Sequence, residues 1–321
     1  MRDHGGDLDR AMARHGGDEG AWTDLSTGIN PVPYPLPDLP GRAWTALPTA
    51  ADLQALRDVA RAAYATRAAV VPLAGAQAAI QLVPRLDAPR TARVLGPTYN
   101  EHAAALAAAG WSVETVGDTD ALAGADLAVV VNPNNPDGRR TPPDALRALA
   151  ARVGQLVVDE SFADAEPALS LAPLLDGTDT RVVVLRSFGK FYGLAGLRLG
   201  FALAGQETAA RLATLAGPWA VSGPAIAAGV RALADSEWQA GTIARLTRDA
   251  ARLDALAGRA GWRLVGGTHL FRTYDTGDAR AAQERLARRR VWSRAFPYSG
   301  GWLRLGLPGT EAGWRALAAA L

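Results

Sequence analysis

Residues 187–200 read Ser-Phe-Gly-Lys-Phe-Tyr-Gly-Leu-Ala-Gly-Leu-Arg-Leu-Gly, and their Lys190 is the only lysine in a chain of 321 residues. Elsewhere the sequence uses arginine, thirty-three times (34 Lys+Arg minus one). A guanidinium stays protonated because its pKa lies above ~12, whereas a lysine amine can lose its proton and attack a carbonyl to form an imine. Lys190 is therefore a candidate for covalent chemistry. The alternative is a compositional preference for arginine with one exception left by chance.

Short apolar runs on both sides of this stretch predict buried strands, and longer helical patterns lie between them. The strands are expected at 92–95, 127–131, 156–158, 182–185 and 199–203, and the helices at 76–86, 102–109 and 143–153. Strands that alternate with helices are typical of a parallel sheet covered by helices. We therefore expect a doubly wound, mostly parallel α/β domain.

The composition and the pattern of predicted helices and strands change along the chain, which predicts two domains. Residues 1–35 are rich in Pro and Gly and are expected to form an N-terminal arm that belongs to the small domain. Residues 36–217 form the large domain. Residues 218–321 begin with long Ala/Leu/Arg helices over about 224–260 and end with short strands near 262–265, 269–274, 292–295 and 302–305, which predicts a smaller α+β domain.

The composition excludes several kinds of function. The sequence has no cysteine, and its four histidines (His4, His15, His102 and His269) lack metal-ligand spacing, so no metal site is expected. A net charge of +2 gives no indication of a nucleic-acid surface. No apolar h-region opens the chain, and no apolar run reaches the length of a membrane span. We expect a cytoplasmic protein without nucleic-acid or membrane partners.

Unusual residues gather where the predicted strands end. Asn135 lies in the turn after one strand, Asp159 ends the next, Ser187 and Lys190 follow a third, and Gly75 opens a helix after Leu73-Ala74. In open α/β sheets, ligands bind beyond the carboxyl ends of the strands. A bound cofactor is expected at this edge of the sheet.

These residues match what pyridoxal phosphate (PLP) would need if it were the partner of Lys190. Asp159 could keep the pyridine nitrogen protonated, although a helix-capping acid is an equal alternative. Asn135 could meet the ring 3-hydroxyl, although an Asn-Pro turn is more often a simple connection. The phosphate needs helix N-terminal amides, hydroxyls and a guanidinium. Those groups are supplied by Gly75-Ala76-Gln77, by Ser187 three residues before the lysine and by Arg198 eight residues after it.

Three motifs together carry a family resemblance. Asn134-Asn135-Pro136-Asp137-Gly138, then Val158-Asp159-Glu160-Ser161-Phe162, then residues 187–200 resemble fold-type I PLP-dependent transferases of the aspartate aminotransferase superfamily, in the histidinol-phosphate aminotransferase branch. The N-terminal motifs His4-Gly5-Gly6-Asp7 and Asp24-Leu25-Ser26-Thr27-Gly28-Ile29-Asn30-Pro31 resemble those of threonine-phosphate decarboxylases of cobalamin biosynthesis.

The resemblance implies a role for each matching residue. Lys190 would form the Schiff base, Asp159 would pair with the pyridine nitrogen and Asn135 with the 3-hydroxyl. The phosphate would be held by Ser187, Arg198 and the amides of Gly75, Ala76 and Gln77. Tyr99 would stack on the ring, the alternative being a tyrosine of the core. The substrate-binding residues would be His4, Gly28, Asn30, Asn135, Arg294 for the substrate phosphate and Arg304 for the α-carboxylate. A disordered terminus is the alternative for His4, and surface ion pairs are the alternative for the two arginines.

The implied reaction is decarboxylation of L-threonine O-3-phosphate to (R)-1-amino-2-propanol O-2-phosphate by a homodimer. The nearest alternative is an aminotransferase acting on histidinol phosphate or another amino acid, and a catalytically inert binding protein is a more distant one. Two departures stand out. Phe162 replaces a tyrosine that relatives often use to contact the cofactor, and no tyrosine lies near Leu47-Pro48, where many relatives have one that reaches the partner subunit's cofactor phosphate.

Overall fold

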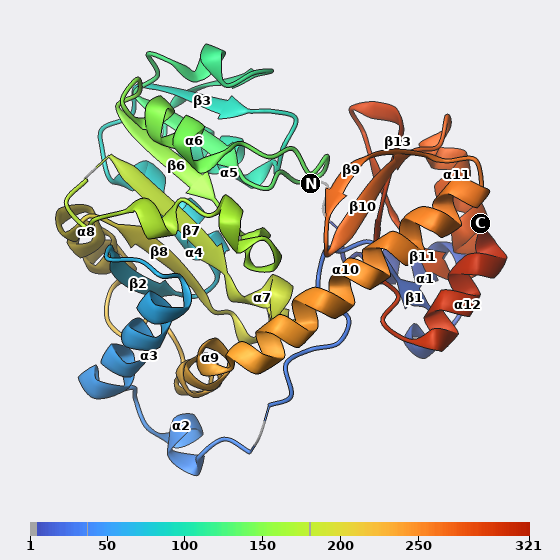
Figure 1. Cartoon of the computed structure of the whole chain (residues 1–321), viewed down its shortest axis with the longest axis horizontal. Helices are drawn as coiled ribbons and strands as arrows, with labels where there is room; N and C mark the ends of the chain where they lie inside the picture. The colour runs from blue at the N-terminus through green and yellow to red at the C-terminus, as the bar shows by residue number, and fades with distance from the viewer. Residues whose placement is uncertain (1–4, 37, 180) are drawn as a thin grey trace. The chain divides into compact units, whose positions relative to one another are not determined.

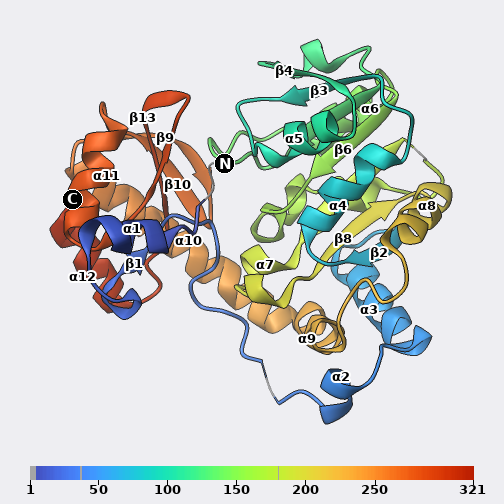
Figure 2. The same ribbon diagram turned by 180° about the vertical axis from the view of Figure 1, so that it is seen from behind.

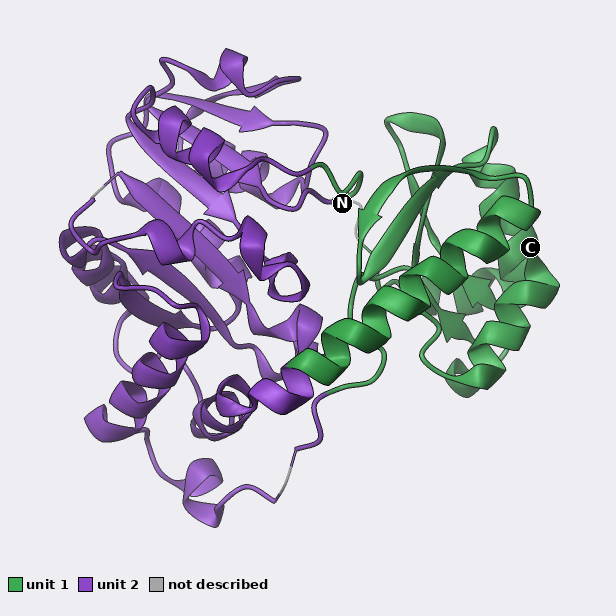
Figure 3. Ribbon diagram, in the orientation of Figure 1, with its two compact units in different colours: residues 1–33, 136–139, 240–321 green, residues 34–135, 140–239 purple. Residues whose placement is uncertain are grey.

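The computed structural model describes residues 5–36, 38–179 and 181–321 (Figure 1). The chain forms two compact units (Figure 3). Unit 1 comprises residues 1–33, 136–139 and 240–321, and unit 2 comprises residues 34–135 and 140–239. The predicted domain boundaries at 35 and 217 stay a prediction. The last change of unit along the chain falls at 239/240, because helix α9 (Gly223–Ala234) packs against α3 (Ala50–Ala63) of unit 2.

Unit 2 is built around a seven-stranded sheet with the order β2-β8-β7-β6-β5-β3-β4, in which β8 alone runs antiparallel to its neighbours. Its strands are β2 (Ala69–Leu73), β3 (Thr91–Leu95), β4 (Ser112–Val116), β5 (Leu127–Val131), β6 (Gln155–Asp159), β7 (Val182–Ser187) and β8 (Gly200–Ala204). The mostly parallel, doubly wound sheet is the predicted fold class, and it is confirmed.

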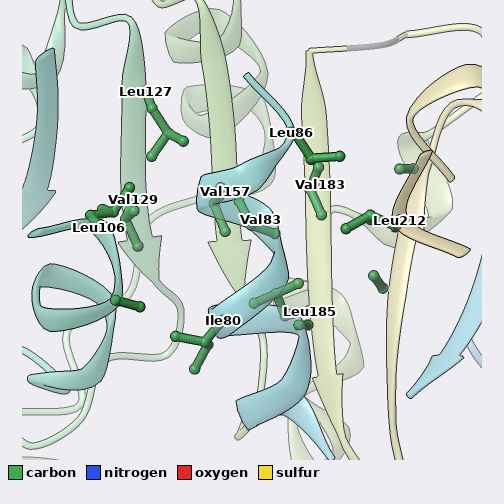
Figure 4. Packing of buried hydrophobic residues seen from close by; sticks show 14 of the residues in the cluster. Ile80, Val83, Leu86, Leu106, Leu127, Val129, Val157, Val183, Leu185 and Leu212 are labelled. Atoms are coloured by element: carbon green, nitrogen blue, oxygen red, sulfur yellow. The ribbon is translucent and has the colours of Figure 1, made fainter. Parts of the chain in front are cut away.

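Helices cover both faces of this sheet (Figures 1 and 2). The helices of unit 2 are α2 (Gly41–Thr45), α3 (Ala50–Ala63), α4 (Ala76–Leu82), α5 (Glu101–Ala108), α6 (Pro143–Ala150), α7 (Phe188–Phe191), α8 (Gln206–Ala216) and α9 (Gly223–Ala234). A cluster of buried side chains joins α4, α5 and α8 to one face of the sheet (Figure 4). Because successive strand residues point to opposite faces, Val157 contributes to this cluster while its neighbours Leu156 and Val158 do not.

Two strands of this sheet were missing from the sequence prediction. β2 contains Pro72, which cannot donate to a ladder and argues against a strand. β2 is nevertheless an edge strand, where the missing N–H is tolerated. β4 forms the opposite edge and is only partly buried, so its apolar content is low.

Unit 1 contains an antiparallel sheet with the order β12-β13-β10-β9 and a short parallel pair, β1-β11. Its strands are β1 (Thr23–Asp24), β9 (Arg263–Thr268), β10 (Phe271–Asp275), β11 (Val291–Trp292), β12 (Arg294–Phe296) and β13 (Ser299–Gly306). Its helices are α1 (Leu8–His15), α11 (Ala279–Arg288), α12 (Glu311–Ala320) and most of α10 (Ser236–Arg259).

One predicted helical stretch, 224–260, is two helices in the structure. The break is Asp235, which ends α9 and accepts a hydrogen bond of 2.9 Å from the backbone N–H of Trp238 in the first turn of α10. Asp at this position stabilises a helix start by satisfying an otherwise unpaired amide.

Candidate active site

A cavity of about 150 Å³ lies at the carboxyl ends of the parallel strands of unit 2. All nine residues predicted to bind a cofactor line it. They are Gly75, Ala76, Gln77, Tyr99, Asn135, Asp159, Ser187, Lys190 and Arg198. The sequence analysis had not included Phe162 and Ser161 among them, and both also line the cavity. Residues up to 123 positions apart therefore form one site (198 minus 75).

Lys190 is held on the short helix α7, which begins directly after β7. Its ammonium nitrogen lies 5.8 Å from the centroid of the buried Phe162 ring, within reach of a cation–π interaction. The chain then folds back so closely that a Cβ on Gly189 would lie 2.8 Å from Cα of Ala195. Phe162 thus forms an aromatic wall of the cavity beside the lysine amine.

Asp159 is buried at the end of β6 and has three hydrogen-bond donors. Its Oδ1 accepts from the backbone N–H of Ser161 at 2.9 Å and from the hydroxyl at 2.5 Å, and its Oδ2 lies 2.8 Å from Nε2 of His102. Burial pushes the pKa of this carboxyl up, but the contacts with His102 and Ser161 outweigh burial and hold the pKa below its usual value. Asp159 is therefore kept as a carboxylate facing the cavity.

His102 was not predicted as a site residue. It lies on α5, 57 residues from Asp159 in sequence, and only the fold brings the two together. The one sequence signal was that it follows Tyr99 by three residues; in the structure the centroids of the two rings lie 6.3 Å apart. Its hydrogen bond to Oδ2 fixes the direction in which the Asp159 carboxylate points.

The other end of the cavity is suited to an anion. Gly75 has φ +83°, and a Cβ there would lie 2.8 Å from Nη2 of Arg198. Arg198 itself has φ +56°, and its Nη1 donates to the carbonyl of Ala195 at 3.1 Å. Ser187 pairs with Gly200 on β8, where a Cβ would lie 2.4 Å from the backbone nitrogen of Ala76. A hydroxyl, a guanidinium and helix-start amides are the donors that a phosphate group needs, and this part of the cavity brings all three together.

The side walls of the cavity are tied together by polar side chains. The Tyr99 hydroxyl donates to the amide oxygen of Gln77 at 3.3 Å. The buried Asn134, next to the cavity residue Asn135, accepts from the Thr98 hydroxyl at 2.6 Å and donates to the carbonyl of Pro97 at 2.9 Å. The loops that carry Tyr99 and Asn135 are therefore bonded to each other.

Unit 1 carries two arginines at paired positions of neighbouring strands, Arg294 on β12 and Arg304 on β13. Nη2 of the buried Arg304 donates to the carbonyl of Ser26 at 2.7 Å. The ring of Phe296 lies 5.6 Å from the Arg294 guanidinium and 5.9 Å from that of Arg304. Burial first, and the charge of Arg294 second, lower the pKa of Arg304 to about 10. Such a pair attracts anions.

Two further predicted substrate residues, Gly28 and Asn30, lie in the N-terminal part of unit 1. Asn30 is buried, and its amide oxygen accepts a hydrogen bond of 2.7 Å from Arg245 and one of 3.1 Å from the backbone N–H of Val32. Gly28 is also buried. His4 lies outside the described residues.

Among residues 5–36, 38–179 and 181–321, no three His, Cys, Asp or Glu side chains are placed to hold a metal ion. No helix in the same part of the chain has the length and apolar character needed to cross a membrane.

The family model described as "Aminotransferase class I and II" matches residues 46–321, and the chain belongs to this family. The threonine-phosphate decarboxylase of Sinorhizobium sp is 46% identical, over 99% of this chain and 97% of the relative. The one of Pseudomonas aeruginosa is 43% identical, over 100% of this chain and 97% of the relative.

Aminotransferases are also similar, but less completely. The histidinol-phosphate aminotransferase of Symbiobacterium thermophilum is 37% identical over 54% of this chain and 49% of the relative. The solved structure of histidinol-phosphate aminotransferase from Sinorhizobium meliloti in complex with pyridoxal-5'-phosphate has a TM-score of 0.83. It is 22% identical and covers 100% of this chain and 94% of that chain, a likeness of fold.

Proposed function

We propose that this chain is a PLP-dependent decarboxylase that converts L-threonine O-3-phosphate to (R)-1-amino-2-propanol O-2-phosphate and CO2 for cobalamin biosynthesis. The observation that carries the proposal is the cavity of unit 2, which is lined by the only lysine of the chain, by the buried carboxylate of Asp159 and by the donors suited to a phosphate. The identity of 43% and 46% to full-length threonine-phosphate decarboxylases supports the choice of reaction.

The residues of the cavity fit PLP. Gly75 leaves open the space beside Arg198 that any Cβ would fill, as a phosphate oxygen near the guanidinium requires. Asp159, held as a carboxylate by His102 and Ser161, suits a protonated pyridine nitrogen. Asn135 and Tyr99 line the same cavity and are proposed to contact the ring. When bound, PLP supplies an electron sink for the bond broken at the substrate α carbon.

The chain's own residues divide the remaining work. Lys190 would hold the cofactor through its amine, and the same amine would donate a proton to the substrate α carbon, where the proton replaces the carboxylate that leaves as CO2. Asp159 would keep the pyridine nitrogen protonated, and Ser187, Arg198 and the Gly75–Gln77 amides would hold the phosphate of the cofactor.

Arg294 and Arg304 are proposed to bind the two anionic ends of the substrate, the phosphate and the α-carboxylate. A phosphorylated amino acid carries both anions, so two guanidiniums at paired strand positions match its charge. A decarboxylase must orient the carboxylate bond rather than the C–H bond for cleavage. The two anchors would set that orientation using binding energy from the non-reacting phosphate.

A homodimer is also proposed, and exposed apolar side chains on unit 2 support it. Trp44 and Leu47, at and after the end of α2, are 68% and 62% exposed, and Trp219, just before α9, is 56% exposed. Helices α2 and α9 pack against each other, so these side chains belong to one region of unit 2. A contiguous exposed apolar patch is typical of a protein–protein interaction site. A cytoplasmic location is proposed as well, because a phosphorylated substrate does not cross a bilayer unaided.

The test compares two products from one substrate. Purified protein loaded with PLP is incubated with L-threonine O-3-phosphate, with and without 2-oxoglutarate, and CO2 and keto acid are measured. The proposal predicts CO2 release in both samples at the same rate. The aminotransferase alternative predicts keto acid that depends on 2-oxoglutarate, without CO2, and that result would overturn the proposal.

A further inference from the structure

A second group of charged side chains lies buried beside the cavity without lining it. Arg186 is 4% exposed, and Nη1 donates to Oε2 of Glu160 at 2.8 Å while Nη2 donates to Oδ1 of Asp164 at 2.7 Å. Its guanidinium carbon lies 4.3 Å from the centroid of the Tyr64 ring. The Ser170 hydroxyl donates to Glu160 at 2.5 Å and lies 3.3 Å from Nη1 of Arg186. These five residues are called the Arg186 network below.

The position of this network in the sequence is informative. Glu160 directly follows Asp159, and Arg186 directly precedes Ser187. Successive side chains of a strand point to opposite faces, so Arg186 points away from the side on which Ser187 reaches the cavity. The Arg186–Glu160 ion pair therefore joins the carboxyl ends of β6 and β7 on the side away from the cavity. The neighbours of these two residues in sequence, Asp159 and Ser187, line the cavity.

The loop after β6 is tied to the same network. Oε1 of Glu160 accepts from the backbone N–H of Leu171 at 2.6 Å, and the backbone N–H of Glu160 donates to the carbonyl of Leu185 at 2.9 Å. Phe162, which faces the amine of Lys190, lies between Glu160 and Asp164 in this loop. Displacement of the guanidinium would thus move Asp159, Phe162 and Ser187 together.

Stability alone does not explain the network. A buried ion pair gains little over well-packed apolar side chains, because removing its charges from water costs as much as their attraction returns. Two of its buried polar atoms, Oδ2 of Asp164 and Nε of Arg186, have no hydrogen-bond partner in the described part of the chain. Burial raises the pKa of Glu160, which shows the same cost at one carboxyl.

We propose that Arg186 and Glu160 are positioning residues that hold Asp159, Phe162 and Ser187 in the geometry that binds the cofactor. The inference rests on the proposed cofactor site and is independent of the substrate. A protein that binds PLP but fails to decarboxylate L-threonine O-3-phosphate would overturn the proposed reaction and leave this inference open to the test below.

The test uses a triple variant without charges, Arg186→Met/Glu160→Gln/Asp164→Asn, which avoids leaving one charge buried alone. Its matched control is Arg272→Met/Asp254→Asn in unit 1, which removes a similar bidentate pair beside Tyr274. The dissociation constant of PLP is measured by absorbance titration of the apo proteins. Thermal unfolding of the apo proteins and kcat of the loaded ones are also measured.

We expect the triple variant to fold with an unfolding midpoint close to that of the parent chain. Its dissociation constant for PLP should rise at least tenfold and its kcat should fall at least tenfold, while the control changes neither by more than twofold. A folded triple variant with parental affinity and kcat would show that the network is merely structural. If the triple variant does not fold, PLP binding by Ser170→Ala tests the proposal instead, because this variant keeps every charge of the network and removes one hydroxyl. About threefold weaker PLP binding supports positioning, and unchanged binding overturns it.

Discussion

Arg294 and Arg304 lie directly opposite each other on the antiparallel strands β12 and β13, so two like charges share one cross-strand pair. Like charges in this position destabilise a sheet by roughly 0.2–1 kcal/mol. The pKa of Arg304 is lowered first by burial and second by the charge of Arg294, so the neighbouring charge adds to the cost of keeping Arg304 protonated in the folded state. A bound dianionic substrate would remove this cost.

The variant Arg294→Met should therefore be more stable than the parent chain, by about 0.5 kcal/mol, and should bind L-threonine O-3-phosphate at least tenfold more weakly. Unfolding in urea and calorimetric titration of the PLP-loaded protein measure the two effects. Arg263→Met is the control, because Arg263 is an exposed arginine of β9 paired with Asp275. Loss of stability with retained substrate affinity would contradict the assignment.

A pH experiment tests the pairing of His102 with Asp159. The pKa of Asp159 is depressed, so its carboxylate stabilises the fold above the unfolded pKa, and this stabilisation is lost as the pH falls through the lower folded value. His102 makes the largest contributions that lower this pKa, so in His102→Leu the pKa of Asp159 should rise. The acid limb of kcat and of the unfolding midpoint should then move to higher pH.

The control for that experiment is His15→Leu, which removes a histidine that lies 3.7 Å from Glu284 in unit 1. Its kcat profile should match that of the parent chain. An unshifted acid limb in His102→Leu would show that His102 does not control the ionisation of Asp159.

A methyl group added at Gly200 tests the proposed phosphate-binding amides by steric crowding, without changing any charge or hydrogen-bonding group. A Cβ at this residue would lie 2.4 Å from the backbone nitrogen of Ala76 and 2.5 Å from the carbonyl carbon of Gly75. Overpacking of this kind costs roughly 1–3 kcal/mol, so Gly200→Ala should weaken PLP binding about tenfold. Gly196→Ala is the matched control in the same segment, since no atom lies within 4 Å of its Cβ position. Equal affinity of both variants for PLP would rule out the proposed role of the Gly75–Ala76 amides.

Most of the large sheet could be predicted because its central strands are continuous apolar runs that end at polar, Gly or Pro residues. β5, Leu127–Val131, is buried at every position and was predicted to the residue. The edge strands β2 and β4 were missed for different reasons. β2 contains a proline, and β4 is only partly buried. The break at Asp235 was missed because a single capping residue interrupts two helices of similar composition.

The site residues that could be predicted from the sequence are those in the motif around Lys190 and those at the ends of the predicted strands. His102 and the Arg186 network could not, because their contacts join residues 57 and 26 positions apart in sequence and depend on which strands become neighbours. Phe162 was recognised as a departure, but its place beside the Lys190 amine appears only in the fold.

The most direct test of the account is CO2 release from carboxyl-labelled L-threonine O-3-phosphate by the chain with Lys190→Arg. Arginine is the cation that the sequence uses everywhere else, so the charge is kept while the amine is lost. We predict that the variant folds, with the unfolding midpoint of the apo parent, and releases no CO2 above background while the parent turns over. Appreciable turnover by the folded variant would contradict the central claim that this one amine carries the chemistry.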